Sequence, residues 1–152
     1  MPKLSAGILL FRKRPAGLQV LLVHPGGPFW KNKGLGAWSI PKGEHPQSEE
    51  PLAAAQREFA EETGITLHGD FLPLGIATQS RGKVTTAWAL EGDYPAAQMR
   101  SNTFSMEWPP KSGRRQEFPE VDRAEWFDLP EARKKILKGQ LPLLDRLQRL
   151  FP

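Results

Sequence analysis

The segment Gly43–Ile65, GEHPQSEEPLAAAQREFAEETGI, carries the most informative pattern in this chain. Its central residues are mostly Ala, Leu, Gln, Arg and Glu, which favour a helix, and Gly64 is a natural stop. We predict a helix over Glu49–Thr63, with Ser48 as its N-cap and Pro51 in its first turn.

The predicted helix has an acidic side next to an apolar side. At about 100° per residue, three glutamates fall within one narrow arc, and three apolar residues form the adjacent stripe. The arc consists of Glu58, Glu61 and Glu62, and the stripe, which we expect to be buried, consists of Leu52, Ala55 and Phe59. Carboxylates at this spacing repel one another and do not stabilise an isolated helix. A hard cation such as Mg²⁺ removes that cost because it prefers oxygen ligands. The alternative is a solvated acidic surface helix.

Nine positions of the segment follow a longer pattern of fixed spacing. They are Gly43, Glu49, Arg57, Glu58, Phe59, Glu61, Glu62, Gly64 and Ile65. This pattern resembles the signature of the Nudix hydrolases, here called the box, and it does so without a departure. The resemblance implies an α/β fold of the Nudix type, an α/β/α sandwich with a mixed β-sheet. In such a fold the box forms a loop–helix–loop catalytic motif on one side of the sheet.

The resemblance also implies a metal site. Its ligands would be Glu58, Glu61 and Glu62, which bind one to three Mg²⁺ ions with Mn²⁺ as a substitute, together with a backbone carbonyl at Gly43. Arg57 and Glu49 would form a supporting ion pair that aligns these carboxylates.

A further acidic residue is expected outside the box. In many Nudix enzymes a glutamate stands six residues before a tryptophan at the start of the last strand region. Counting back from Trp126 gives Glu120, which we predict to be an extra metal ligand or the base, with Glu117 as second choice. The alternative for Glu120 is a surface acid at the entry of a strand.

Length and composition indicate a single soluble domain. At 152 residues the chain can bury a core, and we expect one domain over residues 1–152. The lack of cysteine excludes disulfides, thiolate metal sites and cysteine nucleophiles. The apolar runs are too short to span a membrane, so we expect a cytoplasmic protein with no membrane partner.

The net charge of +4 is modest, but its arrangement is informative. An acidic cluster inside a basic chain suits a metal site surrounded by groups that bind polyphosphate. No nucleic-acid-binding motif is recognised, so we expect a small nucleotide as partner, with an RNA 5′ end as the exception. The expected assembly is a monomer or a homodimer.

Apolar periodicity and turn residues predict the remaining elements. The expected strands are Leu4–Arg12, Leu18–His24, Trp38–Ile40, Leu67–Ala77, Lys83–Leu90, Phe104–Trp108 and Val121–Leu129. Residues 78–82 would connect the fourth and fifth of these, and helices are expected at Pro130–Lys138 and Leu141–Phe151.

Two long loops are the expected recognition surface, because the box itself offers no exposed aromatic side chain. They are Pro25–Ala37 and Glu91–Gln116. For stacking on a base they contain Phe29, Trp30 and Trp108, and for distal phosphates Lys31, Lys33, Arg114 and Arg115, while Lys42 beside the box is a further phosphate contact. Alternatively, Trp30 caps the core and the lysines only solubilise the chain.

The resemblance implies Mg²⁺-dependent hydrolysis of a phosphoanhydride bond in a nucleoside diphosphate linked to another group. The approach Trp38–Glu44 and the spacing around Trp126 are similar to asymmetric diadenosine tetraphosphate hydrolases. Nucleoside triphosphates, nucleotide sugars and RNA 5′ ends stay open as substrates. A different class is a regulator of the Nudix fold that binds a nucleotide without turnover. Such domains commonly lack part of the glutamate set, which is intact here.

Overall fold

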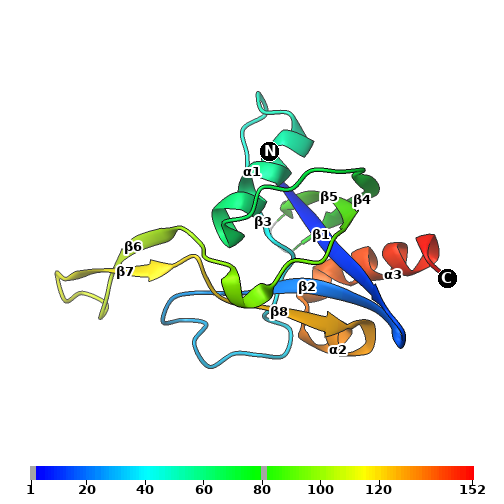
Figure 1. Cartoon of the computed structure of the whole chain (residues 1–152). Coiled ribbons are helices and arrows are strands. Elements are labelled where there is room, and N and C mark those ends of the chain that lie inside the picture. Colours follow the sequence, from blue (N-terminus) through cyan, green and yellow to red (C-terminus); the bar gives the residue numbers. More distant parts are fainter. Residues whose placement is uncertain (1–2, 80–81) are drawn as a thin grey trace.

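The computed structural model describes residues 3–79 and 82–152. A six-stranded sheet forms its centre, in the order β4-β5-β1-β2-β8, with β3 paired to β1 (Figure 1). The strands are β1 (Leu4–Arg14), β2 (Gly17–Pro25), β3 (Lys42–Glu44), β4 (Leu72–Thr78), β5 (Val84–Glu91) and β8 (Val121–Asp128). β1 and β5 pair in parallel and the other pairs are antiparallel, so the expected mixed sheet is confirmed.

Helices cover both faces of this sheet. They are α1 (Pro51–Thr63), α2 (Leu129–Lys135) and α3 (Leu141–Leu150), with short 3₁₀ helices η2 (Ala96–Gln98) and η3 (Lys138–Gln140). Side chains of β1 point alternately to the two faces, as the pleat of a strand requires. Ile8 and Leu10 pack with Phe59 of α1, whereas Leu9 and Phe11 pack with side chains of α2 and α3. The α/β/α layering is therefore confirmed, with a separate core on each face.

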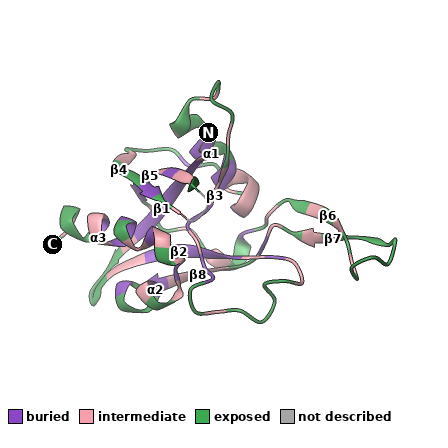
Figure 2. Cartoon of the chain, turned by 180° about the vertical axis from the view of Figure 1, so that it is seen from behind, coloured by how far each residue is buried: buried purple, intermediate pink, exposed green. Residues whose placement is uncertain are grey.

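A small hairpin projects from this body (Figures 1 and 2). It consists of β6 (Thr103–Glu107) and β7 (Arg115–Pro119), which pair antiparallel. The sequence predicted β6 but placed β7 in a loop. Four of the five residues of β7 are exposed, so an alternation between buried and solvated positions was missing from its sequence.

The box helix begins later than predicted. Its N-cap is Glu50 instead of Ser48, and the Glu50 carboxylate accepts hydrogen bonds from the backbone N–H groups of Leu52 and Ala53. Glu49 lies before the helix because its side chain is drawn into an ion pair with Arg57. At the other end, Gly64 adopts a left-handed conformation and closes the last turn.

Burial on α1 follows the predicted stripe with one correction. Ala55 and Phe59 are fully buried, as is Ala54, but Leu52 is only half-buried. Leu52 lies in the first turn, where the chain enters from an exposed loop, and this position keeps one side of it in contact with solvent.

Other boundaries also differ from the sequence-based prediction. The strand expected from Leu67 begins at Leu72, although Leu67 itself is buried in the core from a loop. Trp38 and Ser39 form isolated bridges instead of the strand expected at 38–40, and α2 ends at Lys135. In the connection predicted at 78–82, residues 80 and 81 lie outside the described residues. Of the helices in the described ranges, none is long and apolar enough to cross a membrane.

Candidate active site

The box places its glutamates where α1 meets β3. Packing of Phe59 against β1 fixes the rotation of α1, so that the acidic side of the helix faces the β3 backbone. Gly43 of β3 is in direct contact with Glu58, and a Cβ atom at Gly43 would overlap the Glu58 carboxylate. The glycine at this position is therefore required by the close approach of backbone and side chain.

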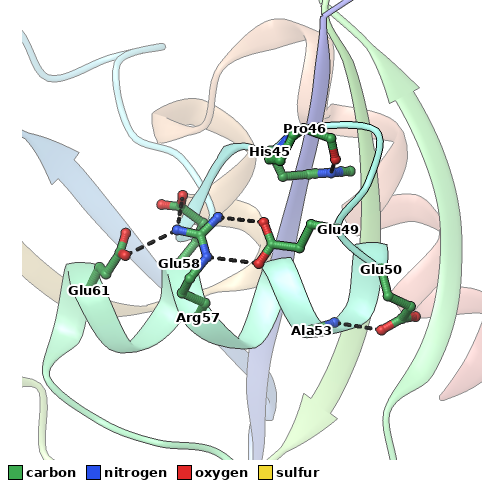
Figure 3. Close-up of polar contacts among 8 residues, drawn as sticks. All are labelled: His45, Pro46, Glu49, Glu50, Ala53, Arg57, Glu58 and Glu61. Atoms are coloured by element: carbon green, nitrogen blue, oxygen red, sulfur yellow. Dashed lines mark hydrogen bonds and ion pairs between the residues drawn. The ribbon is translucent and has the colours of Figure 1, made fainter.

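Arg57 is the centre of the acidic network (Figure 3). Its Nε and Nη2 atoms donate to the two carboxylate oxygens of Glu49, both at 2.9 Å. Its Nη1 atom donates to Glu58 at 2.9 Å and to Glu61 at 3.0 Å. The hydrogen bond from Arg57 lowers the pKa of Glu49, and the pair with Glu49 raises the pKa of Arg57. The structure thus brings together the predicted Arg57–Glu49 pair and links it to two carboxylates of the box.

Glu62 has a different environment. Its carboxylate accepts a hydrogen bond from the backbone N–H of Lys42 at 3.1 Å. Burial, followed by repulsion from Glu58 and Glu120, raises the pKa of Glu62 to about 8. Burial also raises the pKa of Glu58 and of Glu120, in both cases with a further contribution from Glu61. The carboxylates of Glu58, Glu61, Glu62 and Glu120 therefore lie close enough to repel one another, and nearby positive charge does not balance this repulsion.

This donor set fits a hard divalent cation. Every candidate side-chain ligand is a carboxylate oxygen, the donor that Mg²⁺ prefers. In the part of the chain that the structure describes, no three acidic or histidine side chains converge as preformed cation ligands. Glu58 and Glu61 are turned toward Arg57, and Glu62 toward the Lys42 amide. Binding a cation would require these carboxylates to exchange their present partners.

A cavity of about 190 Å³ adjoins the acidic cluster. Its lining includes Glu62 and Glu120, and also Trp30 and Lys42 from the predicted substrate-binding set. Trp30 is 37% exposed, and the Lys33 ammonium lies 5.2 Å from the centroid of its ring. Trp30 thus lies at the cavity and does not cap the core, which answers one of the alternatives left by the sequence.

A second cavity, of about 220 Å³, shares Glu62 and Val121 with the first. Its other lining residues come from η2, from Met99–Ser101 and from β8. No motif in the sequence pointed to Met99 or Arg100. A larger cavity, of about 740 Å³, lies at the β1–β2 turn and the C-terminal residues, and its lining contains no residue of the box.

Two hydrogen bonds fix the backbone of Glu120. Its N–H donates to Asn102 at 2.8 Å and its carbonyl accepts from Gly26 at 2.9 Å. A Cβ atom at Gly26 would overlap the Pro119 carbonyl, so the consecutive glycines at 26 and 27 were an unused signal of this close approach. Glu117, the second choice, lies exposed on β7 and lines neither of the two cavities at the cluster.

The two predicted recognition loops meet through an aromatic contact. Phe29 and Trp108 pack edge to face with ring centroids 5.4 Å apart. Lys31 is exposed in the 25–37 loop. Arg115 donates to Ser105 within the hairpin, and the Arg114 N–H donates to Ser112. Within the described residues, the hydrogen bonds and ion pairs of these two arginines stay inside the hairpin and do not reach the carboxylates.

A family model for the NUDIX domain matches residues 1–147 of this chain. The chain belongs to the NUDIX domain family. The Nudix resemblance carried by the box is thereby confirmed, and with it the fold class. Nudix enzymes generally use divalent metal ions such as Mg²⁺, which agrees with the donor set at Glu58, Glu61 and Glu62. Their role as ligands in this chain stays a prediction.

Individual relatives are more distant. The RNA pyrophosphohydrolase of Bartonella henselae is 30% identical over 107 residues, 60% of this chain, and the match spans only 57% of that relative's length. The structure of a C. elegans Ap4A hydrolase binary complex has a TM-score of 0.67 at 20% identity, with 96% of each chain covered. The NUDIX domain of Shewanella oneidensis NrtR, complexed with ADP ribose, has a TM-score of 0.66 at 20% identity, covering 100% of this chain and 90% of that one. At this identity the two structures show a shared fold.

Proposed function

We propose that this protein is a Mg²⁺-dependent pyrophosphohydrolase that cleaves a phosphoanhydride bond in a nucleoside diphosphate linked to another group. One observation carries this proposal: a single cavity is lined by Glu62 and Glu120 and by Trp30 and Lys42. Carboxylates for a cation, an ammonium group for a phosphate and an aromatic ring for a base are the groups that such a substrate requires.

The box would hold the metal ions. Glu58, Glu61 and Glu62 are the proposed ligands, with a backbone carbonyl at Gly43, and Mn²⁺ would substitute for Mg²⁺. A bound divalent cation supplies neutralisation of the charge on the phosphate oxygens during hydrolysis. Arg57, held by Glu49 through two hydrogen bonds, orients Glu58 and Glu61 without touching the substrate.

Glu120 is the proposed base, or an additional ligand. It lines the cavity beside Glu62, and burial raises its pKa, which favours acceptance of a proton from an attacking water. Its anchored backbone keeps the carboxylate in place while that proton moves.

The 25–37 loop would select the substrate. Trp30 would stack on the base, and Lys42, with its backbone beside Glu62, would contact the diphosphate. Lys31 and Lys33 are proposed contacts to further phosphates. Arg114 and Arg115 lie in the hairpin, away from the carboxylates, and would act only on longer substrates.

Two substrate classes have specific support. The similarity to an Ap4A hydrolase favours dinucleoside polyphosphates, whereas the curated relative, an RNA pyrophosphohydrolase, favours an RNA 5′ end. We place the dinucleoside polyphosphates first, because the match to the Ap4A hydrolase covers 96% of this chain and the match to the RNA pyrophosphohydrolase covers 60%.

The test is product release with Mg²⁺ from a panel of dinucleoside polyphosphates, nucleoside triphosphates, nucleotide sugars and triphosphorylated RNA. Chromatography of the products shows which bond is cleaved. We expect release that requires Mg²⁺ and is lost in Glu62→Gln, with a dinucleoside polyphosphate as the best substrate. Nucleotide binding without release above the level of Glu62→Gln would instead identify a regulator that lacks turnover.

A further inference from the structure

His24 is a fully buried histidine outside the acidic cluster. It belongs to β2, and its Nδ1 atom lies 2.8 Å from a carboxylate oxygen of Asp122 on β8. Its Nε2 atom lies 2.5 Å from the backbone carbonyl oxygen of Lys33, in the 25–37 loop. The ring also packs edge-on against Trp38, with centroids 5.2 Å apart. One side chain thus joins the sheet to the middle of the loop.

The two contacts of His24 depend on how many protons its ring carries. A carboxylate and a backbone carbonyl are both acceptors, so each ring nitrogen must donate a proton to make its contact. A neutral imidazole has only one N–H and can satisfy one of the two partners. Both contacts are therefore made together only when the ring donates one N–H to each partner, as an imidazolium does.

The contact between His24 and the Lys33 carbonyl affects the position of Trp30, which lies in the same loop. The ends of the loop are fixed by hydrogen bonds from Gly26 to Glu120 and from Gly36 to Lys134. Between them, the backbone hydrogen bonds of Trp30 to Gly27 and of Lys33 to Trp30 stay inside the loop. Together with the aromatic contact of Phe29 to Trp108, the His24 bond ties the middle of the loop to the body.

We propose that His24 is a positioning residue: its ion pair with Asp122 holds the loop at Lys33 and thereby keeps Trp30 at the cavity beside Glu120. The consequence for catalysis rests on the proposed function, whereas the hold on the loop does not. His24 does not itself line the cavity, and its side-chain hydrogen bonds go to Asp122 and Lys33, not to the carboxylates of the box.

The proposal includes a response to pH, set by the charges around the ring. On β8, Asp122 faces His24, and the Arg123 Nε atom lies 3.8 Å from the same Asp122 oxygen. The loop contributes only the Lys33 carbonyl, because the Lys33 ammonium lies over the Trp30 ring. From α2, the Lys135 ammonium lies near Gly34, 4.0 Å from the position of a Cβ atom there.

Loss of one proton from the ring would break one contact. A carboxylate is a stronger acceptor than a backbone carbonyl, so the remaining proton stays on Nδ1, facing Asp122. The bare Nε2 then faces the Lys33 oxygen, two acceptors repel, and the loop is released. Replacement of Asp122 by Asn changes this result, because the amide can donate to Nδ1 and a neutral ring keeps its N–H toward Lys33.

Hydrogen exchange of the substrate-free protein tests the hold on the loop. Exchange of the amides of residues 27–36 is compared with that of β1 from about pH 5.5 to about pH 8.5, a range in which histidines titrate. In the unaltered protein we expect the loop to lose protection relative to β1 as the pH rises. Asp122→Asn should keep the protection and remove its pH dependence. His68→Gln, at an exposed histidine, is the matched control and should behave as the unaltered protein.

His24→Phe tests the link to the substrate. The ring keeps its packing against Trp38 but donates to neither partner, and Asp122, with 30% of its side chain exposed, stays solvated. We expect faster loop exchange at every pH and, on the best nucleotide substrate, a raised KM with kcat nearly unchanged. The rise in KM should not exceed that of Trp30→Ala.

The outcomes separate the two proposals. The same pH dependence of loop exchange in the unaltered protein and in Asp122→Asn would overturn the role of His24. This comparison tests the proposal even if His24→Phe does not fold. Altered exchange with an unchanged KM would overturn the effect on substrate binding. Altered exchange in a protein that hydrolyses no nucleotide would support the hold on the loop and contradict the proposed function.

Discussion

The acidic cluster and the proposed recognition loops lie next to each other but are held in different ways. Three carboxylates of the box share one partner close in sequence: Arg57 bonds Glu58, its neighbour, Glu61, four residues on, and Glu49, eight residues back. The aromatic side chains are held by distant partners, since Phe29 packs on Trp108. The first region rests on a helix with a buried face, and the second on a loop and an exposed hairpin. The contrast separates a site that is determined locally from a surface that depends on tertiary contacts.

The largest expected effect is on the locally determined region. Glu62→Gln or Glu61→Gln should lower turnover by orders of magnitude with the fold intact, because a neutral amide is a poor Mg²⁺ ligand. The measurement is kcat on the best substrate at saturating Mg²⁺, with circular dichroism as the control for folding. Unchanged turnover in both variants would remove these residues from the site.

A pH-dependent loss of stability is the next effect. The folded protein retains the Glu62 proton up to about pH 8, whereas the unfolded chain releases it near the ordinary value of 4.5. The stability from this proton is therefore complete below pH 4.5 and is lost as the pH rises toward 8. In the presence of a chelator, the melting temperature should fall between about pH 5 and about pH 8, and more steeply than in Glu62→Gln. Equal slopes in the two proteins would contradict the assigned environment of Glu62.

Trp30→Ala should have a moderate effect and only on binding. Stacking on a base contributes about 1–3 kcal/mol and is formed in substrate and transition state alike, so KM should rise by about 5- to 150-fold with little change in kcat. Leu35→Ala is the matched control from the same loop, since Leu35 is exposed and does not line the cavity. A loss confined to kcat would place Trp30 among the residues that act on the reaction itself.

The smallest effect is expected in the hairpin. Replacing Arg114 and Arg115 together by Ala should weaken binding of long polyphosphates more than of short ones, because exposed charges act weakly and only within reach. The ratio of KM values for substrates with different numbers of phosphates measures this. An equal change for every length would assign these arginines to the hairpin structure, where Arg115 already bonds Ser105.

How far the sequence predicts each region follows from the same contrast. The box helix, its acidic arc and its buried Phe59 follow from spacing along one helix. The proximity of Glu120 to the box was reached only through the resemblance, by counting from Trp126. The helix start at Pro51 was missed because Glu50 caps the helix in place of Ser48, while the side chain of Glu49 pairs with Arg57. The pairing of His24 with Asp122 and Lys33 joins three separate segments, so the spacing of residues along the chain does not predict it.

The alternation of β1 between two cores has a consequence for how this protein can change over time. A single residue inserted into β1 would turn every later side chain of that strand to the opposite face of the sheet and would disrupt both cores together. Length changes are tolerated instead in surface connections such as the 25–37 loop and the tip of the β6–β7 hairpin. Those are the segments in which the proposed recognition residues stand. Descendants of this chain can therefore acquire new substrates by changing loop length while the helix that carries the carboxylates stays as it is.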